Sequence, residues 1–199
     1  MILPIVRYGH PVLRQRGAEI SDVTEAIHQL SADMLETMYA AHGIGLAAQQ
    51  VGQPLLLTVI DVRDSERPSQ LFLGVKEVPL DSMMPLILLN PTITRREGDE
   101  TAGGEGCLSF PKISADVPRV DTVHVSAMLL NGQPIQFTAT GLLARAVQHE
   151  LDHLNGVLFI DRMTPDARKP IEEAIQEMEK ETKAALKKNR RGSRTRATP

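Results

Sequence analysis

The chain contains little of what several protein classes require. Cys107 is the only cysteine in 199 residues, so an intrachain disulfide framework is impossible. No run of about 18 apolar residues occurs, which excludes a membrane-spanning helix. The segment Met1–Arg7 lacks the basic-then-apolar layout of a signal peptide, and we therefore expect a cytoplasmic protein. A formal net charge of −3 gives no reason to expect DNA or a membrane as a partner of the whole surface.

What the chain does contain is enough apolar residues for one globular domain, since 42% of the sequence is hydrophobic. Asp22 and Glu25 have the spacing of a capping box, and they predict an amphipathic helix of roughly 18 residues that stops at Gly43. We expect its apolar stripe in the core; the stripe comprises Val23, Ile27, Leu30, Met34, Leu35 and Met38.

The middle of the chain is rich in β-type segments. Strands are predicted at 55–60, 86–89 and 123–130, and Asn131-Gly132 predicts a hairpin turn into a strand at 135–137. Between residues 61 and 85 the sequence is rich in proline, serine and charge, which favours a surface excursion.

Two further helices are expected after the strands. Residues 142–154 carry a dense apolar stripe that ends at Gly156. A last helical segment opens at Thr164-Pro165, with Pro170 in its first turn. These elements predict an α+β fold with antiparallel sheets packed around a central helix, plus N-terminal and C-terminal helices. We expect a catalytic domain over 1–165, a C-terminal helix over 166–188, and a basic, disordered tail over 189–199.

The central helix carries the motif His149-Glu150-Leu151-Asp152-His153. Residues four apart share one helix face, so the two imidazoles can converge on one divalent metal ion. Such an ion lowers the pKa of a water molecule enough for it to act as a nucleophile at neutral pH, and Glu150 is placed to exchange a proton with that water. The motif therefore predicts a metal-dependent hydrolase.

A catalytic site of this kind usually has three protein ligands, and the motif supplies two. Cys107, in Glu105-Gly106-Cys107-Leu108-Ser109, is the leading candidate for the third ligand, although a lone cysteine is more often a small buried apolar residue. A thiolate accepts iron, nickel or cobalt as readily as zinc. Two other interpretations stay open. In a zincin-type peptidase Glu172 or Glu173 would be the third ligand, and in a non-catalytic module the metal would only stabilise the fold.

A third segment, Gly43-Ile44-Gly45-Leu46-Ala47-Ala48-Gln49-Gln50, combines glycines that permit close backbone approach with amides that can donate to an oxyanion. Together with Glu105–Ser109 and Gln148–Gly156, it resembles the three signature motifs of peptide deformylases, in the same order. Pro11–Arg14 and Asn90-Pro91 are also similar to that family, and the resemblance extends from about residue 5 to residue 165.

The resemblance implies removal of the formyl group from N-formylmethionyl peptides, with release of formate. It implies one divalent metal ion, Fe²⁺ in the cell with Zn²⁺, Ni²⁺ or Co²⁺ as substitutes, held by Cys107, His149 and His153. The remaining roles that it implies are these: Glu150 as general acid and base, the Gln50 amide and the Leu108 backbone N–H as oxyanion donors, Ile44, Gly45 and Gly106 as binders of the substrate backbone, and Leu142, Arg145 and Ala146 as the border of the methionine pocket.

A basic tail would also suit an enzyme of nascent chains. From Lys183 onward the sequence has no acidic residue; a solvated, disordered end is one interpretation, and contact with ribosomal RNA is the alternative hypothesis.

Overall fold

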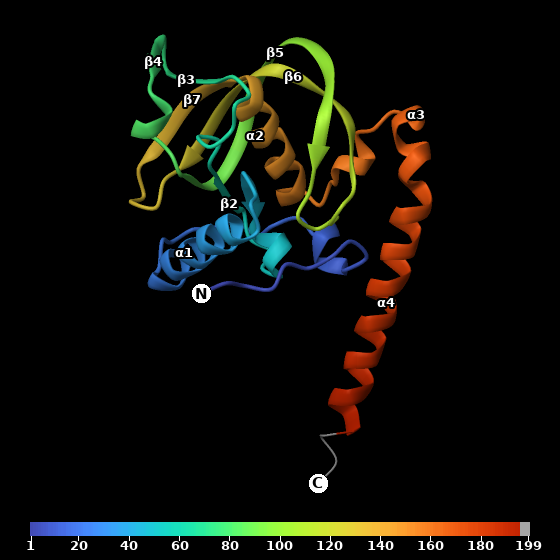
Figure 1. Ribbon diagram of the computed structural model, residues 1–199. Coiled ribbons are helices and arrows are strands. Elements are labelled where there is room, and N and C mark those ends of the chain that lie inside the picture. Colours follow the sequence, from blue (N-terminus) through green and yellow to red (C-terminus); the bar gives the residue numbers. More distant parts are fainter. Residues whose placement is uncertain (196–199) are drawn as a thin grey trace.

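One antiparallel sheet curves around a buried helix (Figure 1). The computed structural model describes the backbone of residues 1–195 and the side chains of residues 1–189. The strands lie in the order β1-β2-β5-β6-β7-β3-β4, and every neighbouring pair is antiparallel. The strands are β1 (Gly45–Ala47), β2 (Leu57–Ile60), β3 (Ser69–Leu73), β4 (Lys76–Val78), β5 (Leu86–Gly106), β6 (Ser114–Met128) and β7 (Pro134–Thr140). The helices are α1 (Glu25–Ala40), α2 (Gly141–Leu154), α3 (Pro165–Arg168) and α4 (Glu172–Thr195), with short 3-10 turns at Pro11–Arg14, Ala48–Val51, Leu80–Ser82, Phe159–Asp161 and Lys169–Ile171.

Helix α2 is the centre of the molecule. Every residue from Leu142 to Leu154 is buried, so this helix has no solvent-facing stripe. Its apolar side packs on the concave face of the sheet, where Leu143 and Val147 meet Leu86, Val123 and Phe137 in the largest core cluster. Burial of this apolar surface fixes the helix against the sheet and leaves its polar residues facing the end of β5. The α+β fold predicted from the sequence is confirmed.

Strand β5 is long, and its first part and its later part pair with different sets of strands. Its first residues pair with both β2 and β6, and its later residues pair with β6 alone. Register shifts between Leu89 and Thr92, Ile93 and Arg95, and Glu97 and Glu100 bend the strand, as bulges do. The bent half ends at Gly106, opposite Ser114, and delivers Cys107 to the face of α2.

The first predicted helix is confirmed, but its predicted start is wrong. Helix α1 begins at Glu25 with Thr24 as N-cap, and Asp22 lies outside it, so no capping box forms there. Met34 and Met38 are fully buried in a cluster with Leu46, Leu57 and Val59, as the stripe predicted.

The surface excursion predicted between residues 61 and 85 is also wrong in part. This stretch contains strands β3 and β4, and β3 pairs with β7 and extends the sheet. Leu71 is fully buried in the core cluster under α2. The alternation in Ser69–Leu73 is too short and too polar to separate a strand from a loop without its partner β7.

The C-terminal segment packs beside the body and then extends beyond it (Figure 1). Ile175 of α4 is buried with Val12, Leu13 and Phe159, and these residues fix its first half. The helix runs to Thr195, past the boundary expected at residue 188, because lysine, arginine and alanine are good helix formers. Residues 196–199 of the predicted disordered tail lie outside the described residues. None of the helices in the described part is long and apolar enough to cross a bilayer.

Gly156, which ends α2, has φ of +72°, and a Cβ there would lie 2.6 Å from the Arg14 carbonyl oxygen. We therefore expect Gly156→Ala to lower the free energy of unfolding by more than the roughly 1–2 kcal/mol of the left-handed conformation alone. Gly52→Ala is the matched control, because Gly52 has φ of +81° and nothing within 4 Å. Urea unfolding measures both, and equal losses would contradict the proposed clash.

Asp161 joins the N-terminal turn to the segment after α2 by accepting hydrogen bonds from the Arg14 side chain and the Leu158 N–H. Burial opposes ionisation, but these hydrogen bonds outweigh it and hold the pKa of Asp161 below 3.8. A carboxyl with a lowered pKa stabilises the fold above its ordinary pKa, and this stabilisation is lost as the pH falls through the folded value. Asp161→Asn should thus lower the melting temperature at pH 6, and the gap to the parent protein should narrow toward pH 3. The exposed Asp64→Asn is the control; a gap for Asp161→Asn that stays constant with pH would refute this account.

Candidate metal centre

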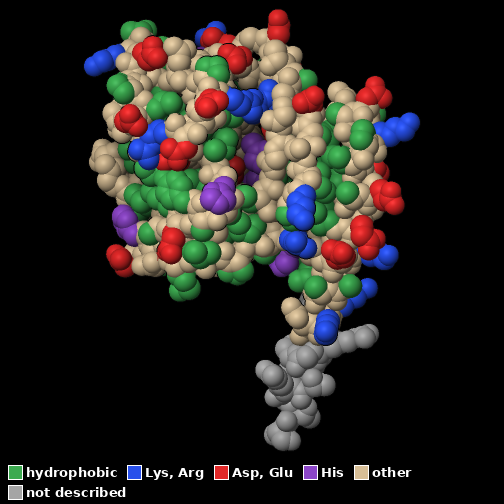
Figure 2. Space-filling model, in the orientation of Figure 1, with side chains coloured by type: hydrophobic (Ala, Val, Ile, Leu, Met, Phe, Trp, Pro, Cys, Tyr) green, Lys and Arg blue, Asp and Glu red, His purple; other side chains and the backbone are tan. Residues whose placement is uncertain are grey.

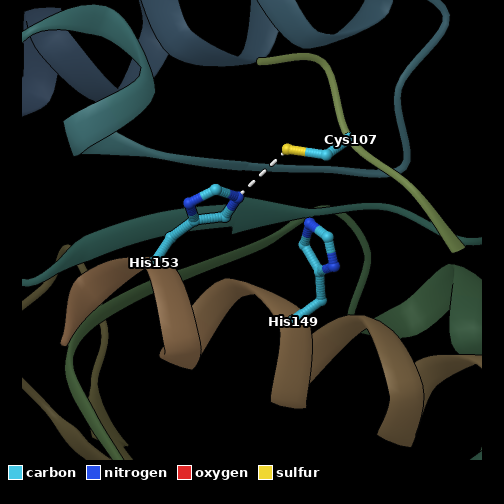
Figure 3. Close-up of side chains that lie close together, drawn as sticks. All are labelled: Cys107, His149 and His153. Atoms are coloured by element: carbon cyan, nitrogen blue, oxygen red, sulfur yellow. Dashed lines mark hydrogen bonds between the residues drawn. The ribbon is translucent and has the colours of Figure 1, made fainter. Parts of the chain in front are cut away.

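Three potential metal ligands converge where β5 ends against α2. One ligand atom each from Cys107, His149 and His153 lies within 4.8 Å of the others. Figure 3 shows both imidazoles rising from α2 toward the sulfur, which comes from the segment after β5. The Cys107 Sγ lies 3.2 Å from the His153 Nε2. The structure thus brings Cys107 together with the two histidines of the motif, as a shared metal site would require.

The local structure explains this convergence. His149 and His153 are one helical turn apart on a helix that is buried on all sides. After Gly106 the chain turns, with the Phe110 N–H donating to the Cys107 carbonyl and the Ile113 N–H donating to the Phe110 carbonyl. Phe110 is buried against Phe159 and Tyr8, which fixes the turn and keeps the thiol pointed at α2.

Glu105 orients the first histidine, and it was not among the predicted site residues. Its Oε2 lies 2.9 Å from the His149 Nδ1, which leaves the His149 Nε2 free to face the sulfur. The same carboxylate accepts from Arg119 and from Arg145, each at 3.0 Å. Glu105 and Cys107 are two residues apart at the end of one strand, so period-2 alternation was the available signal for a shared face.

Asp152 is part of the same network. Its carboxylate is buried and accepts hydrogen bonds from Arg119 and Arg162. Arg119 therefore lies between Glu105 and Asp152, and each buried charge has a partner. The network ties β5, β6 and α2 together directly behind His149.

The electrostatics of the two histidines differ. Burial lowers the pKa of both rings. For His149, the hydrogen bonds that the ring donates to the Cys107 and Glu105 side chains outweigh burial and raise its pKa well above the ordinary value. His153, whose Nδ1 is buried without a hydrogen-bond partner, keeps a pKa well below the ordinary value, partly because of the charge on His149.

Glu150 lies beside the three ligands but is not one of them. Burial raises the pKa of its carboxyl to about 7, and its Oε2 is buried without a hydrogen-bond partner. Its other oxygen lies against Gly45, where a Cβ would come within 2.4 Å of it. Gly45 is thus required by space, and a buried carboxyl with a pKa near neutrality can both take up and release a proton.

Gln50 approaches the same cluster from the 3-10 turn Ala48–Val51. Its Oε1 accepts from the Ala47 N–H at 2.8 Å, which fixes the amide orientation. Its Nε2 then points toward the Cys107 sulfur at 3.5 Å and the Ser109 hydroxyl at 3.4 Å. Leu108 follows Cys107 and lines the same cavity.

The cluster opens into a cavity of about 650 Å³, visible as a hollow in the middle of the face shown in Figure 2. All the predicted site residues except His153 line it. Arg145 lines the cavity, and its guanidinium is held by Glu105 and the carbonyls of Thr101 and Val117. The backbone of Ile44 is held in place because its carbonyl accepts a hydrogen bond of 2.9 Å from the Asp61 N–H.

The donor set fits a divalent metal ion. One sulfur and two imidazole nitrogens make up the three-ligand arrangement of a catalytic site with an open fourth position. The zincin alternative is wrong on geometry: Glu172 lies on α4 and pairs with Arg168, and neither it nor Glu173 belongs to the cluster.

Comparisons with known proteins agree with this geometry. A model of the family described as polypeptide deformylase matches residues 2–169. A peptide deformylase of Opitutus terrae is 49% identical over 190 residues, covering 95% of this chain and 99% of its own length. A peptide deformylase of Methylacidiphilum infernorum is 44% identical over 90% of this chain and 94% of its own.

Solved structures are similar as well. The crystal structure of a Synechococcus elongatus peptide deformylase in complex with actinonin has a TM-score of 0.74 and 41% identity, and the match covers 88% of this chain and 85% of that one. The Thermotoga maritima peptide deformylase has a TM-score of 0.71 and 34% identity, over 83% of this chain and 99% of its own.

We expect Glu105→Gln to weaken metal binding by about 10- to 100-fold, because His149 loses the carboxylate that orients its ring. A competition titration with a metal chelator measures this affinity. Glu97→Gln is the matched control, since Glu97 also pairs with a histidine, His124, at 3.0 Å but away from the cluster. An affinity unchanged in Glu105→Gln would show that the ring is held by packing alone.

Proposed function

The chain belongs to the polypeptide deformylase family, a family of metal-dependent hydrolases that remove the N-formyl group of nascent peptides, and we propose how its own residues divide this reaction. The observation that carries the proposal is the convergence of Cys107, His149 and His153 beside a buried Glu150 at the floor of one cavity. A structural metal site would need neither the unpartnered carboxylate nor the cavity.

Cys107, His149 and His153 would hold the metal ion. When bound, the ion supplies a Lewis acid that makes a water molecule nucleophilic near neutral pH and draws charge from the formyl oxygen. Glu105 keeps the His149 ring in place. Burial opposes ionisation of Glu105, but hydrogen bonds from His149 and Arg119 outweigh it and lower the pKa of this carboxyl to about 2, so it stays ionised.

Glu150 would carry the proton. Water attacks the formyl carbon, the C–N bond breaks, and formate and a free amine result, so one proton must move from the water to the departing nitrogen. The Glu150 carboxyl, with its pKa raised to about 7 by burial, accepts and returns a proton without a large cost either way. Because Gly45 has no side chain, the Glu150 carboxyl has room to face both the attacking water and the departing nitrogen.

Gln50 and Leu108 would stabilise the oxyanion that develops on the formyl group. The Ala47 N–H holds the Gln50 carbonyl, so the Nε2–H groups stay directed at the cavity floor. A donor that is already oriented needs no reorganisation during the reaction, which is why such contacts contribute strongly to rate. The Leu108 backbone N–H is the second proposed donor.

The substrate backbone would bind in strand fashion. The end of β5 pairs with β6 on one side only, so Gly106 offers a free edge, and Gly45 lines the same cavity. Addition of a peptide strand there is supported by Ile44, whose position is fixed from behind by Asp61. Leu142 and Ala146 of α2 would contact the methionine side chain, and Arg145 would form its charged but internally paired border.

We propose Fe²⁺ as the physiological ion, with Zn²⁺, Ni²⁺ or Co²⁺ as substitutes, because one soft thiolate and two imidazoles accept all four. Elemental analysis of anaerobically purified protein tests this choice. The proposed location is the cytoplasm, and the proposed partner beyond the substrate is the ribosome, reached through the lysines and arginines after Lys183. A charge-driven contact of this kind should weaken as salt rises.

Glu150→Gln and Gln50→Ala should both retain metal and lose formate release, by about 10²–10³-fold in kcat for Gln50→Ala. Formate release from formyl-Met-Ala-Ala, with metal content measured in the same samples, checks this. Gln53→Ala, a change of the same type on an exposed residue outside the cavity, is the matched control. Near-normal turnover in either variant would make the assigned role wrong.

A further inference from the structure

The mouth of the cavity carries basic side chains from three separate segments. His42 follows α1, Arg67 precedes β3, and Lys112 lies between β5 and β6. All three are exposed, and all three line the cavity. Figure 2 shows basic side chains and a histidine flanking the central hollow. We call these three residues the basic rim.

The acidic residues of the cavity cannot neutralise this rim. Glu105 and Glu150 are the only carboxylates among its lining residues, and both are buried at the floor. Glu105 is already paired with Arg119 and Arg145. Within the described residues neither Arg67 nor Lys112 has a carboxylate oxygen within 4.0 Å.

The two permanently charged rim residues are positioned differently. Arg67 lies against the free edge of β5, where its Nη1 is 3.4 Å from the Gly104 carbonyl oxygen, and the exposed Asp116 is close to Gly104 and weakens the local positive potential. For Lys112, none of the contacts described above places a carboxylate nearby. It adopts φ of 65°, which is uncommon for lysine and keeps it at the tip of the turn that follows Cys107.

A bound peptide would reach this rim. The cavity is within the size range of sites that enclose ligands of several hundred daltons, so it holds more than one amino-acid side chain. Suppose that the formyl group lies at Cys107 and that the peptide backbone pairs with Gly106. The residues after methionine then leave the cavity between the turn that contains Lys112 and the segment that contains His42. Their side chains therefore pass through the positive potential of the rim.

Resting on the proposed function, we infer that this chain discriminates among formyl-methionyl peptides by charge, and that Lys112 and Arg67 favour substrates with acidic side chains directly after the methionine. The interaction is between exposed charges, so it is modest and acts on KM rather than on the chemical step. Salt should reduce it, because the Debye length falls from about 10 Å at 0.1 M to about 3 Å at 1 M.

The test compares kcat/KM of the metal-loaded enzyme for formyl-Met-Glu-Ala and formyl-Met-Lys-Ala, and for formyl-Met-Ala-Glu and formyl-Met-Ala-Lys. All are C-terminal amides, so that no terminal carboxylate contributes charge. We expect formyl-Met-Glu-Ala to be favoured over formyl-Met-Lys-Ala by about threefold to tenfold at low salt and by much less at 1 M salt, with a smaller difference in the second pair. The difference should lie in KM.

Variants locate the effect. Lys112→Asn and Lys112→Asp both tolerate a positive φ, so they remove or reverse the charge without straining the turn. The glutamate-to-lysine ratio should fall toward one in Lys112→Asn and below one in Lys112→Asp, with a smaller fall in Arg67→Gln. Because each ratio is taken within one variant, a change in overall activity cancels. Lys76→Glu, an exposed lysine on β4 outside the cavity, should keep the parental ratio.

The inference fails if the parent enzyme shows no charge preference, if the preference survives in a Lys112→Asp, Arg67→Glu double variant, or if Lys76→Glu shifts the ratio as much as Lys112→Asp. The last result would assign the effect to overall charge. Failure of the proposed function is a separate outcome, seen as no formate from the neutral peptide formyl-Met-Ala-Ala in the parent enzyme.

Discussion

The Glu105 carboxylate is the contact on which the site depends. It accepts hydrogen bonds from His149 on α2, from Arg119 on β6 and from Arg145 one turn earlier on α2. A charge this deeply buried is tolerated only because it has several partners. Replacing such a network with apolar residues can leave a fold as stable, so its value lies in geometry: it fixes β5, β6 and α2 at one distance and one rotation.

The fold supplies the conditions for that contact. The bulges of β5 bend the strand so that its second half leaves β2 and crosses in front of α2. A straight strand would continue in the plane of the sheet and carry Cys107 away from the histidines. Burial of α2 on every side keeps water from competing for the polar groups, which strengthens each interaction at the site.

The features that could be predicted from the sequence are those whose residues are neighbours in the chain and follow the spacing of one helix. The His149–His153 spacing and the stripe of α2 are local, and they predicted two imidazoles on one helix face, where the structure has them. Glu105 was missed because its role needs a partner from β6 and another from α2, and neither is visible from its neighbours in the chain. Strands β3 and β4 were missed for the same reason: Leu71 is buried only once β7 lies beside it. The end of α4 was misjudged because charge was weighed above helix propensity.

Cys107 carries the single thiol of the sequence. Cys107 is partly exposed in the cavity, and within these 199 residues it has no second thiol to meet. A sulfenic acid formed on it therefore has no resolving cysteine inside the chain, and its return to the thiol depends on a small thiol from solution. Such a molecule reaches the sulfur through the cavity it lines, and a peptide seated there blocks both the oxidant and the rescue. Turnover and redox repair thus share one entrance.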